Sequence, residues 1–179
     1  VIRYLIPCLI VFNLGAQQTS LDQAGPTVVA VGEAEIELVK IIFAPLSTKG
    51  ELSSEQRKQG EQLNALFAND FSFYRQKFSV IKPAGDLAQI VDGAPPYDQL
   101  TRRGIANWCR LTISAGSGSS IRYRLEMFSV EKQLMIFNEA GRISQKGWRA
   151  EGHQLSDSLY QALTGQSSIF TSSIFFVSD

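Results

Sequence analysis

The sequence predicts an α/β fold: a mixed sheet of about five strands, two main helices packed on one face, and an antiparallel meander in the second half. Three observations predict it. An apolar, β-branched run precedes a proline, two stretches repeat apolar residues at intervals of three and four, and three consecutive segments alternate apolar with polar residues. A length of 179 residues suits one domain with a normal core.

The first half of the fold is predicted to begin with a strand and a long helix. Residues 36–44 are rich in β-branched and apolar side chains, which favours a well-buried strand. Pro45 ends this strand, because proline has no amide proton to donate to a sheet ladder. Ser53 and Gln56 have the spacing of a capping box, so a helix is predicted to begin there.

Polar residues are expected to end this helix. Apolar residues continue at helical spacing as far as Phe67, and Asn69-Asp70 is expected to stop the helix before Phe71. Residues 78–81 are a short apolar run and predict a second strand. The strand–helix–strand order predicts a crossover in which the helix packs on the sheet.

A loop and a short helix are predicted next. Residues 83–96 contain prolines and an Asp-Gly pair, which are typical of a surface loop. Residues 97–103 predict a short helix that turns Leu100 inward and is stopped by Gly104.

The antiparallel meander is predicted from residues 109–115, 121–127 and 134–143, with short turns between them. Alternation with a period of two indicates one buried face and one wet face. The wet face is expected to carry charged side chains, namely Arg110, Arg122, Arg124 and Glu126.

The last helix is predicted at residues 148–164. Apolar residues including Leu155 and Leu159 share one helical face, with His153 and Asp157 on the opposite face. Gly165 is predicted to end the helix, because glycine adopts the left-handed conformation of a helix cap without a Cβ clash. The β-branched and aromatic residues that follow predict an extended segment.

This helix and its continuation resemble the end of the amino-terminal domain in the TolB family, the periplasmic component of the Tol–Pal cell-envelope system. The matching features, in order, are His153, Ser156-Asp157, Tyr160, Leu163-Thr164-Gly165, Phe170, Thr171 or Ser172, Ile174 and Val177. In that family the helix runs into a strand that enters a β-propeller. The resemblance implies a TolB-like amino-terminal domain at residues 36–168 and the start of that strand at 169–179, with the propeller absent because no four-stranded repeat is visible.

The amino-terminal residues predict export. Residues 1–16 have one early positive charge, a short apolar run and a small-residue end, as in a cleaved signal peptide that leads to the periplasm; an amino-terminal anchor that is kept is the alternative. Residues 17–35 mix Gln, Ser, Thr, Gly and Pro, which predicts a flexible arm. The resemblance implies that this arm contacts the inner-membrane protein TolA; a disordered leader is the equal alternative.

Composition argues against several classes of ligand. The 17 basic and 17 acidic residues give zero net charge, so no electrostatic footprint for nucleic acid or anionic lipid is expected. Two cysteines with one histidine cannot make a structural zinc site, and neither a metal nor a cofactor is expected. Cys109 is expected to pack as a small buried residue rather than act as a reactive thiol.

No motif predicts an active site. Residues 116–121 nearly match a dinucleotide fingerprint, but the third glycine is missing and a strand follows instead of a helix, so a hairpin loop is predicted. His153 and Asp157 are four residues apart and can pair on the helix surface. Because no nucleophile is placed near them, the chain is not expected to be an enzyme.

Two sets of residues are candidates for protein contacts instead. In the TolB family the helix face that carries His153 and Asp157 lies near the propeller junction, so an interdomain or partner contact is expected there. This expectation extends to Phe170, Ile174 and Phe176, because an apolar strand without its propeller would be an exposed edge. The second set is Arg122 and Arg124, whose guanidinium forks match carboxylates of an acidic partner; a solvated sheet face is the alternative.

The function implied by the resemblance is that of a non-enzymatic periplasmic adaptor in the Tol–Pal system. Such a protein serves envelope integrity, cell division and macromolecule transport through contact with a TolA-like protein. The family assigns Pal binding mainly to the propeller, so that contact is expected to be lost here. The alternatives are a stand-alone periplasmic binding module, a TolB remnant without function, and a small hydrolase that rests only on His153 and Asp157.

Overall fold

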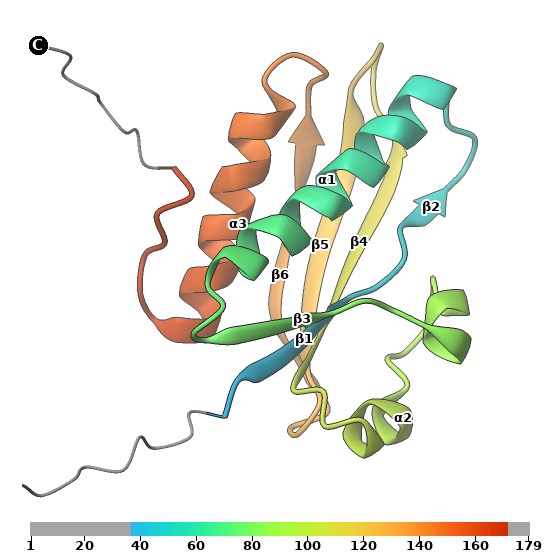
Figure 1. The fold of residues 1–179 in the computed structure, drawn as a ribbon. Coiled ribbons are helices and arrows are strands. Elements are labelled where there is room, and N and C mark those ends of the chain that lie inside the picture. Colours follow the sequence, from blue (N-terminus) through green and yellow to red (C-terminus); the bar gives the residue numbers. More distant parts are fainter. Residues whose placement is uncertain (1–36, 172–179) are drawn as a thin grey trace, which may run out of the picture. The chain divides into compact units, whose positions relative to one another are not determined.

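A mixed six-stranded sheet organises residues 37–171, the part of the chain that the computed structural model describes (Figure 1). Its strands are β1 (Val39–Phe43), β2 (Ser47–Lys49), β3 (Phe78–Ile81), β4 (Asn107–Ala115), β5 (Ile121–Ser129) and β6 (Leu134–Ile143). The helices are α1 (Ser54–Phe73), the 3-10 helix η1 (Gly85–Gln89), α2 (Tyr97–Arg102) and α3 (Trp148–Thr164). The predicted signal peptide and arm, together with Ile174 and Phe176, lie outside the described residues.

The strand order is β3-β1-β4-β5-β6, with β2 paired to β4. Strand β1 runs parallel to β3 and β4, whereas β4, β5 and β6 form an antiparallel meander. The predicted fold class is therefore confirmed. The sheet has one more strand than expected, because Pro45 interrupts the first extended segment and the chain then rejoins the β4 ladder at Ser47, opposite Thr112.

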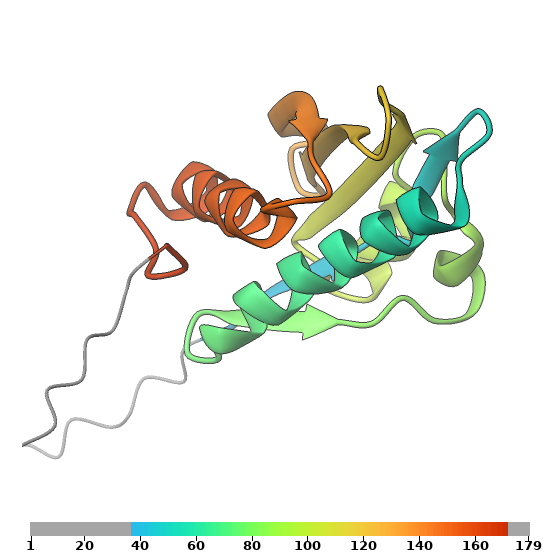
Figure 2. The same cartoon turned by 90° about the horizontal axis from the view of Figure 1, so that it is seen from above.

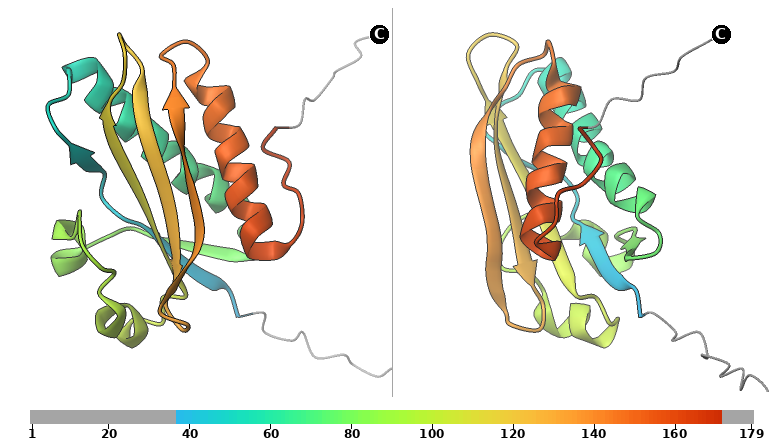
Figure 3. Two further views of the ribbon diagram at one scale, coloured as in Figure 1. Left: turned by 180° about the vertical axis from the view of Figure 1, so that it is seen from behind. Right: turned by 90° about the vertical axis from the view of Figure 1, so that its left-hand side faces the viewer.

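The two long helices pack on the same face of the sheet (Figures 2 and 3). The capping box at the start of α1 is confirmed: the Ser53 side chain accepts from the Gln56 amide, and the Gln56 side chain accepts from the Ser53 amide. The expected end at Asn69-Asp70 is wrong, since α1 continues to Phe73. Phe71 is fully buried, and burying a side chain of this size stabilises the extra turn by about 1.5–3 kcal/mol.

Two glycines let these helices approach their neighbours closely. A Cβ atom on Gly152 of α3 would lie 2.9 Å from Leu63 Cδ1 of α1, and a Cβ atom on Gly60 of α1 would overlap Ile113 of β4. The backbone of α3 therefore meets α1 at Gly152, while the backbone of α1 meets the sheet at Gly60. Both contacts leave no room for a larger residue without movement of a buried side chain.

Among residues 37–171, the other face of the sheet is covered at one end. There, η1 and α2 bury a second core whose members are Ile42, Ala44, Leu87, Leu100, Ile105, Trp108 and Val130. The predicted wet face is wrong at this end: Glu126 is 9% exposed and is paired with Arg110, which also donates to the carbonyl of Gly93 in the covering loop. Arg122 and Arg124, farther along β5, are exposed as expected.

The helices themselves give no sign of a membrane span. Within residues 37–171, no helix combines the length with the apolar content that a membrane crossing requires.

The close approach of Gly60 to Ile113 predicts that a larger residue at position 60 destabilises the domain. We expect Gly60→Val to lower the free energy of unfolding by about 1–3 kcal/mol, because overpacking against Ile113 outweighs the better helix propensity of valine. Urea unfolding followed by circular dichroism measures the change. Ala65→Val at an exposed position of α1 is the control, with an expected cost of about 0.7 kcal/mol or less. Equal stability of Gly60→Val and the parent chain would contradict this packing.

Candidate functional site

The chain after α3 folds back against the domain, and residues 165–171 are here called the exit segment. Gly165 begins it in the left-handed conformation, with φ of 70°, and its amide donates to the carbonyl of Gln161. Thr164 Oγ1 then accepts from the amide of Gln166, which tightens the reversal. The predicted helix end at Gly165 is confirmed, and the chain direction after it is set by this turn.

Polar contacts hold the exit segment on both sides. Asp157 Oδ1 accepts from the amide of Ser168 at 2.6 Å. The hydroxyl of Tyr74, just beyond the end of α1, accepts from the amide of Ile169 at 2.9 Å. Lys77 Nζ donates to Gln166 Oε1 at 3.0 Å. The first two bonds satisfy backbone amides that no sheet or helix pairs, and the third ties the segment to the chain beyond α1 through two side chains.

An aromatic cluster lies beneath the exit segment. Phe170 packs edge-on against Tyr74 and Tyr160, with ring centroids 5.4 and 6.0 Å away. Tyr160 is 2% exposed and also contacts Phe71 of α1 and Phe78 of β3. The cluster therefore joins α1, β3, α3 and the exit segment, and rings in such arrangements add about 0.5–1.5 kcal/mol per pair beyond the burial of their area.

His153 pairs with a residue of α1 rather than with its helical neighbour. His153 Nδ1 lies 2.9 Å from Asp70 Oδ2, whereas the carboxylate of Asp157 is used by Ser168. The predicted His153–Asp157 pair is therefore wrong. The sequence could not identify Asp70 as the partner, because it predicts that Asn69-Asp70 ends the helix, whereas α1 continues to Phe73 and turns this carboxylate toward α3.

The site residues predicted from the sequence thus lie in three separate parts of the domain. The structure brings Asp157 and Phe170 together at the exit segment, and His153 lies one turn earlier in a groove between α1 and α3. Arg122 and Arg124 lie on the opposite face of the sheet. Tyr74 and Lys77 are contacts that sequence reasoning missed; the aromatic residues near the end of α1 were the only local indication.

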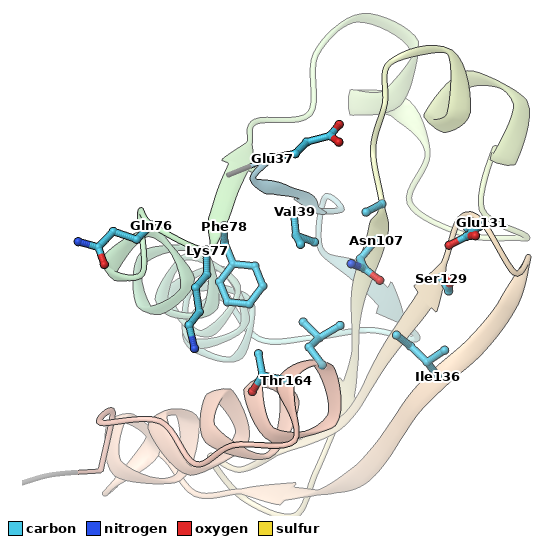
Figure 4. Close-up of a pocket in the computed structure, with 12 residues that line it drawn as sticks. Glu37, Val39, Gln76, Lys77, Phe78, Asn107, Ser129, Glu131, Ile136 and Thr164 are labelled. Carbon is cyan, nitrogen blue, oxygen red and sulfur yellow. The ribbon is translucent and has the colours of Figure 1, made fainter. Parts of the chain in front are cut away.

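A cleft of about 500 Å³ opens beside the aromatic cluster, at the end of the sheet where α3 stops (Figure 4). Val39 and Phe78 point into it from one side and Ile136 from the other, and Thr164 at the end of α3 lies below them. Leu163 of α3 also lines the cleft. The sequence did not predict this cleft, because its lining comes from segments far apart in the chain. Polar and charged side chains, among them Glu37, Lys77 and Glu131, line the cleft together with the apolar ones, and such a mixed lining suits a peptide segment.

Neither the cleft nor the exit segment presents recognisable metal or thiol chemistry. Within residues 37–171, no group of three or more His, Cys, Asp or Glu side chains could hold a metal ion. Burial raises the pKa of the Cys109 thiol, and the nearby Glu126 carboxylate raises it further. Cys109 is 1% exposed and stays protonated, so it packs as a small buried residue as expected.

The sequence is similar to proteins of the Tol-Pal system. No protein-family profile matches the sequence. The chain is 22% identical over 176 residues to the Tol-Pal system protein TolB of Anaplasma marginale, covering 98% of this chain and 38% of that protein. It is 25% identical over 176 residues to TolB of Thiobacillus denitrificans, covering 97% of this chain and 39% of that protein.

A solved structure agrees with these matches in fold. TolB from Acinetobacter baumannii superposes with a TM-score of 0.53 and 19% identity, over 75% of this chain and 30% of that one. At this identity the likeness shows the fold alone. The chain spans about two-fifths of the length of the curated relatives, and together the matches support an amino-terminal TolB-like domain.

The bond from Tyr74 to the exit segment can be tested directly. Tyr74→Phe removes the acceptor for the Ile169 amide and keeps the ring, so we expect a loss of about 1 kcal/mol and roughly fivefold faster amide exchange at Ile169. Hydrogen exchange followed by NMR measures it. Tyr97→Phe on α2 is the control and should leave exchange at Ile169 unchanged. Equal exchange at Ile169 in both variants would show that the bond does not hold the segment.

Proposed function

We propose that this chain contributes a non-enzymatic, TolB-like adaptor domain to the Tol–Pal system of the periplasm. The residue pattern from His153 to Val177 and the matches to two TolB proteins over nearly the whole chain support this proposal. The contacts that hold the exit segment against the domain support it as well. Export through a signal peptide at residues 1–16 is part of the same proposal.

The observation that carries the proposal is the anchoring of the exit segment. A domain that passes its chain to a further element must fix where the chain leaves and in which direction. Here Asp157 and Tyr74 bind consecutive backbone amides, and Phe170 packs into the aromatic cluster beside them. We propose that residues 36–168 are the adaptor domain and that 169–179 begin the strand that enters a propeller in the TolB family.

The proposed contacts now divide by role. Asp157 and Phe170 position the exit segment through contacts within the domain, so their effect on a partner or a propeller would be indirect. His153 lies in the groove between α1 and α3 and is 37% exposed at its side chain, which leaves it able to meet a neighbouring domain. Ile174 and Phe176 stay proposals as members of the same interdomain contact.

The amino-terminal arm is the proposed route to a partner. In the TolB family this segment contacts the inner-membrane protein TolA, and we propose the same contact for residues 17–35. They precede β1, which begins at Val39 beside the cleft. The Pal contact belongs mainly to the propeller in that family, so we do not propose it for these residues.

A second candidate function is a stand-alone binding module of the periplasm. The cleft beside Phe78 and Ile136 favours it, because the cleft is built entirely from described residues of this domain. Such a module would bind a small ligand or a peptide without any Tol–Pal component. The two candidates predict different partners in the same experiment.

Affinity capture from an envelope extract separates the candidates. We expect the full chain to recover a TolA-like protein and a chain that lacks residues 17–35 to lose it, because the arm is the proposed contact. Partners are identified by mass spectrometry. Deletion of 17–35 leaves the described sheet and helices untouched, and circular dichroism of both chains checks this.

Each outcome of that capture has a consequence. Recovery of a TolA-like protein by both chains would move the contact from the arm to the domain. Failure of both chains to recover any Tol–Pal component would contradict the adaptor function. A ligand that still binds the full chain, and is lost on Ile136→Asp at the cleft, would then favour the stand-alone module.

A further inference from the structure

A row of basic side chains crosses the sheet on the face opposite the long helices. The register aligns Lys49 of β2 with Ser114 of β4, Ser114 with Arg122 of β5, and Arg122 with Arg142 of β6. Residues aligned in this way point to the same face of a sheet. Arg124 lies two residues further along β5 and on the same face, because successive side chains of a strand alternate between faces.

These four cations, here called the basic row (Lys49, Arg122, Arg124 and Arg142), are free of carboxylate partners among the described residues. All four are exposed. Neither ion pair found within residues 37–171 includes any of them. Arg122 and Arg142 even stand directly opposite each other, an arrangement of like charges that destabilises a strand pair. The domain therefore maintains an uncompensated positive surface in a chain whose net charge is zero.

The surroundings give the basic row a defined boundary. The next carboxylate on the same face, Glu126, is bonded to Arg110 at 2.9 Å under the loop that carries Gly93. Glu139 lies on the helix side and accepts from the hydroxyl of Tyr123. Between β2 and β6 the surface forms a shallow depression of about 440 Å³, lined in part by the basic row.

We propose that the basic row binds an extended acidic segment of a partner protein. Arg122 and Arg124 are alternate residues of one strand, so their spacing equals that of alternate side chains in any extended chain, about 6.6–6.8 Å. A segment with Asp or Glu at every second position thus matches both guanidinium groups in register. Each guanidinium can bind a carboxylate with two parallel hydrogen bonds.

Two features favour a peptide over other anions. A membrane surface is flat and would not enter the depression between β2 and β6, whereas side chains of a peptide can. Proteins that bind nucleic acid usually have a wide basic surface and a net positive charge. This chain has zero net charge and a patch of four cations, which favours a peptide over a nucleic acid.

Fluorescence anisotropy tests the proposal with the full chain and a labelled peptide of alternating Glu and Thr. We expect binding that weakens as salt rises, and about tenfold weaker binding by the double variant Arg122→Gln/Arg124→Gln. The control is Arg57→Gln/Lys58→Gln, which removes two exposed cations from α1 and should bind like the parent chain. Thermal unfolding verifies that both variants are folded.

Three further probes decide between kinds of partner. A peptide with the same composition in a Glu-Glu-Thr-Thr repeat should bind more weakly, because its carboxylates do not match the spacing of Arg122 and Arg124. Phosphatidylglycerol vesicles and a single-stranded DNA oligonucleotide should bind more weakly as well. Absence of peptide binding, an unchanged affinity in the Arg122/Arg124 variant, or equally tight binding of vesicles, DNA or the mismatched peptide would overturn the proposal.

Discussion

The arrangement of this domain depends on the buried ring of Tyr160. Its neighbours come from the end of α1, the start of β3 and the exit segment, and the closest, Tyr74, has its ring centroid 4.6 Å away. A buried tyrosine needs a partner for its hydroxyl, and Lys77 Nζ supplies one at 2.9 Å. Because the same lysine bonds Gln166, the polar and aromatic contacts around Tyr160 fix the chain exit together.

The two faces of the sheet differ in what covers them. One face is filled by α1 and α3, which meet through Gly152 and end at the aromatic cluster. On the other face, η1 and α2 cover only the end around Trp108, and the far end keeps the exposed basic row. The aromatic and polar contacts that hold the exit segment thus lie on the face covered by α1 and α3. The basic row, which we propose as a partner surface, lies on the opposite face.

The sequence predicted the parts of the fold that depend on interactions between residues close in the chain. Ser53 and Gln56 marked the start of α1, alternation marked the meander, and Gly165 marked the end of α3. Long-range packing decided the rest. The helix continues past Asp70 because Phe71 is buried by β3 and α3, and β2 exists because β4 offers a free ladder after Pro45.

The candidate site divides in the same way. Asp157 and Phe170 were identified from their order in the chain, but their partners, the Ser168 amide and Tyr74, follow from the reversal at Gly165 and the extra turn of α1. The pairing of His153 with Asp70 required the same unforeseen turn. Arg122 and Arg124 were visible from alternation alone, whereas Lys49 and Arg142 join them only through the sheet register.

The central claim is that the exit segment and the end of α1 are energetically coupled through the aromatic cluster. A double-mutant cycle that compares Tyr74→Phe with Tyr74→Leu, each with and without Phe170→Leu, tests it most directly by urea unfolding, because both changes at Tyr74 remove the hydroxyl bonded to the Ile169 amide. The account predicts a coupling free energy of about 0.5–1.5 kcal/mol between the two rings, which pack edge-on with centroids 5.4 Å apart. Strictly additive effects of the two ring replacements would contradict it, because the rings would then contribute to stability independently.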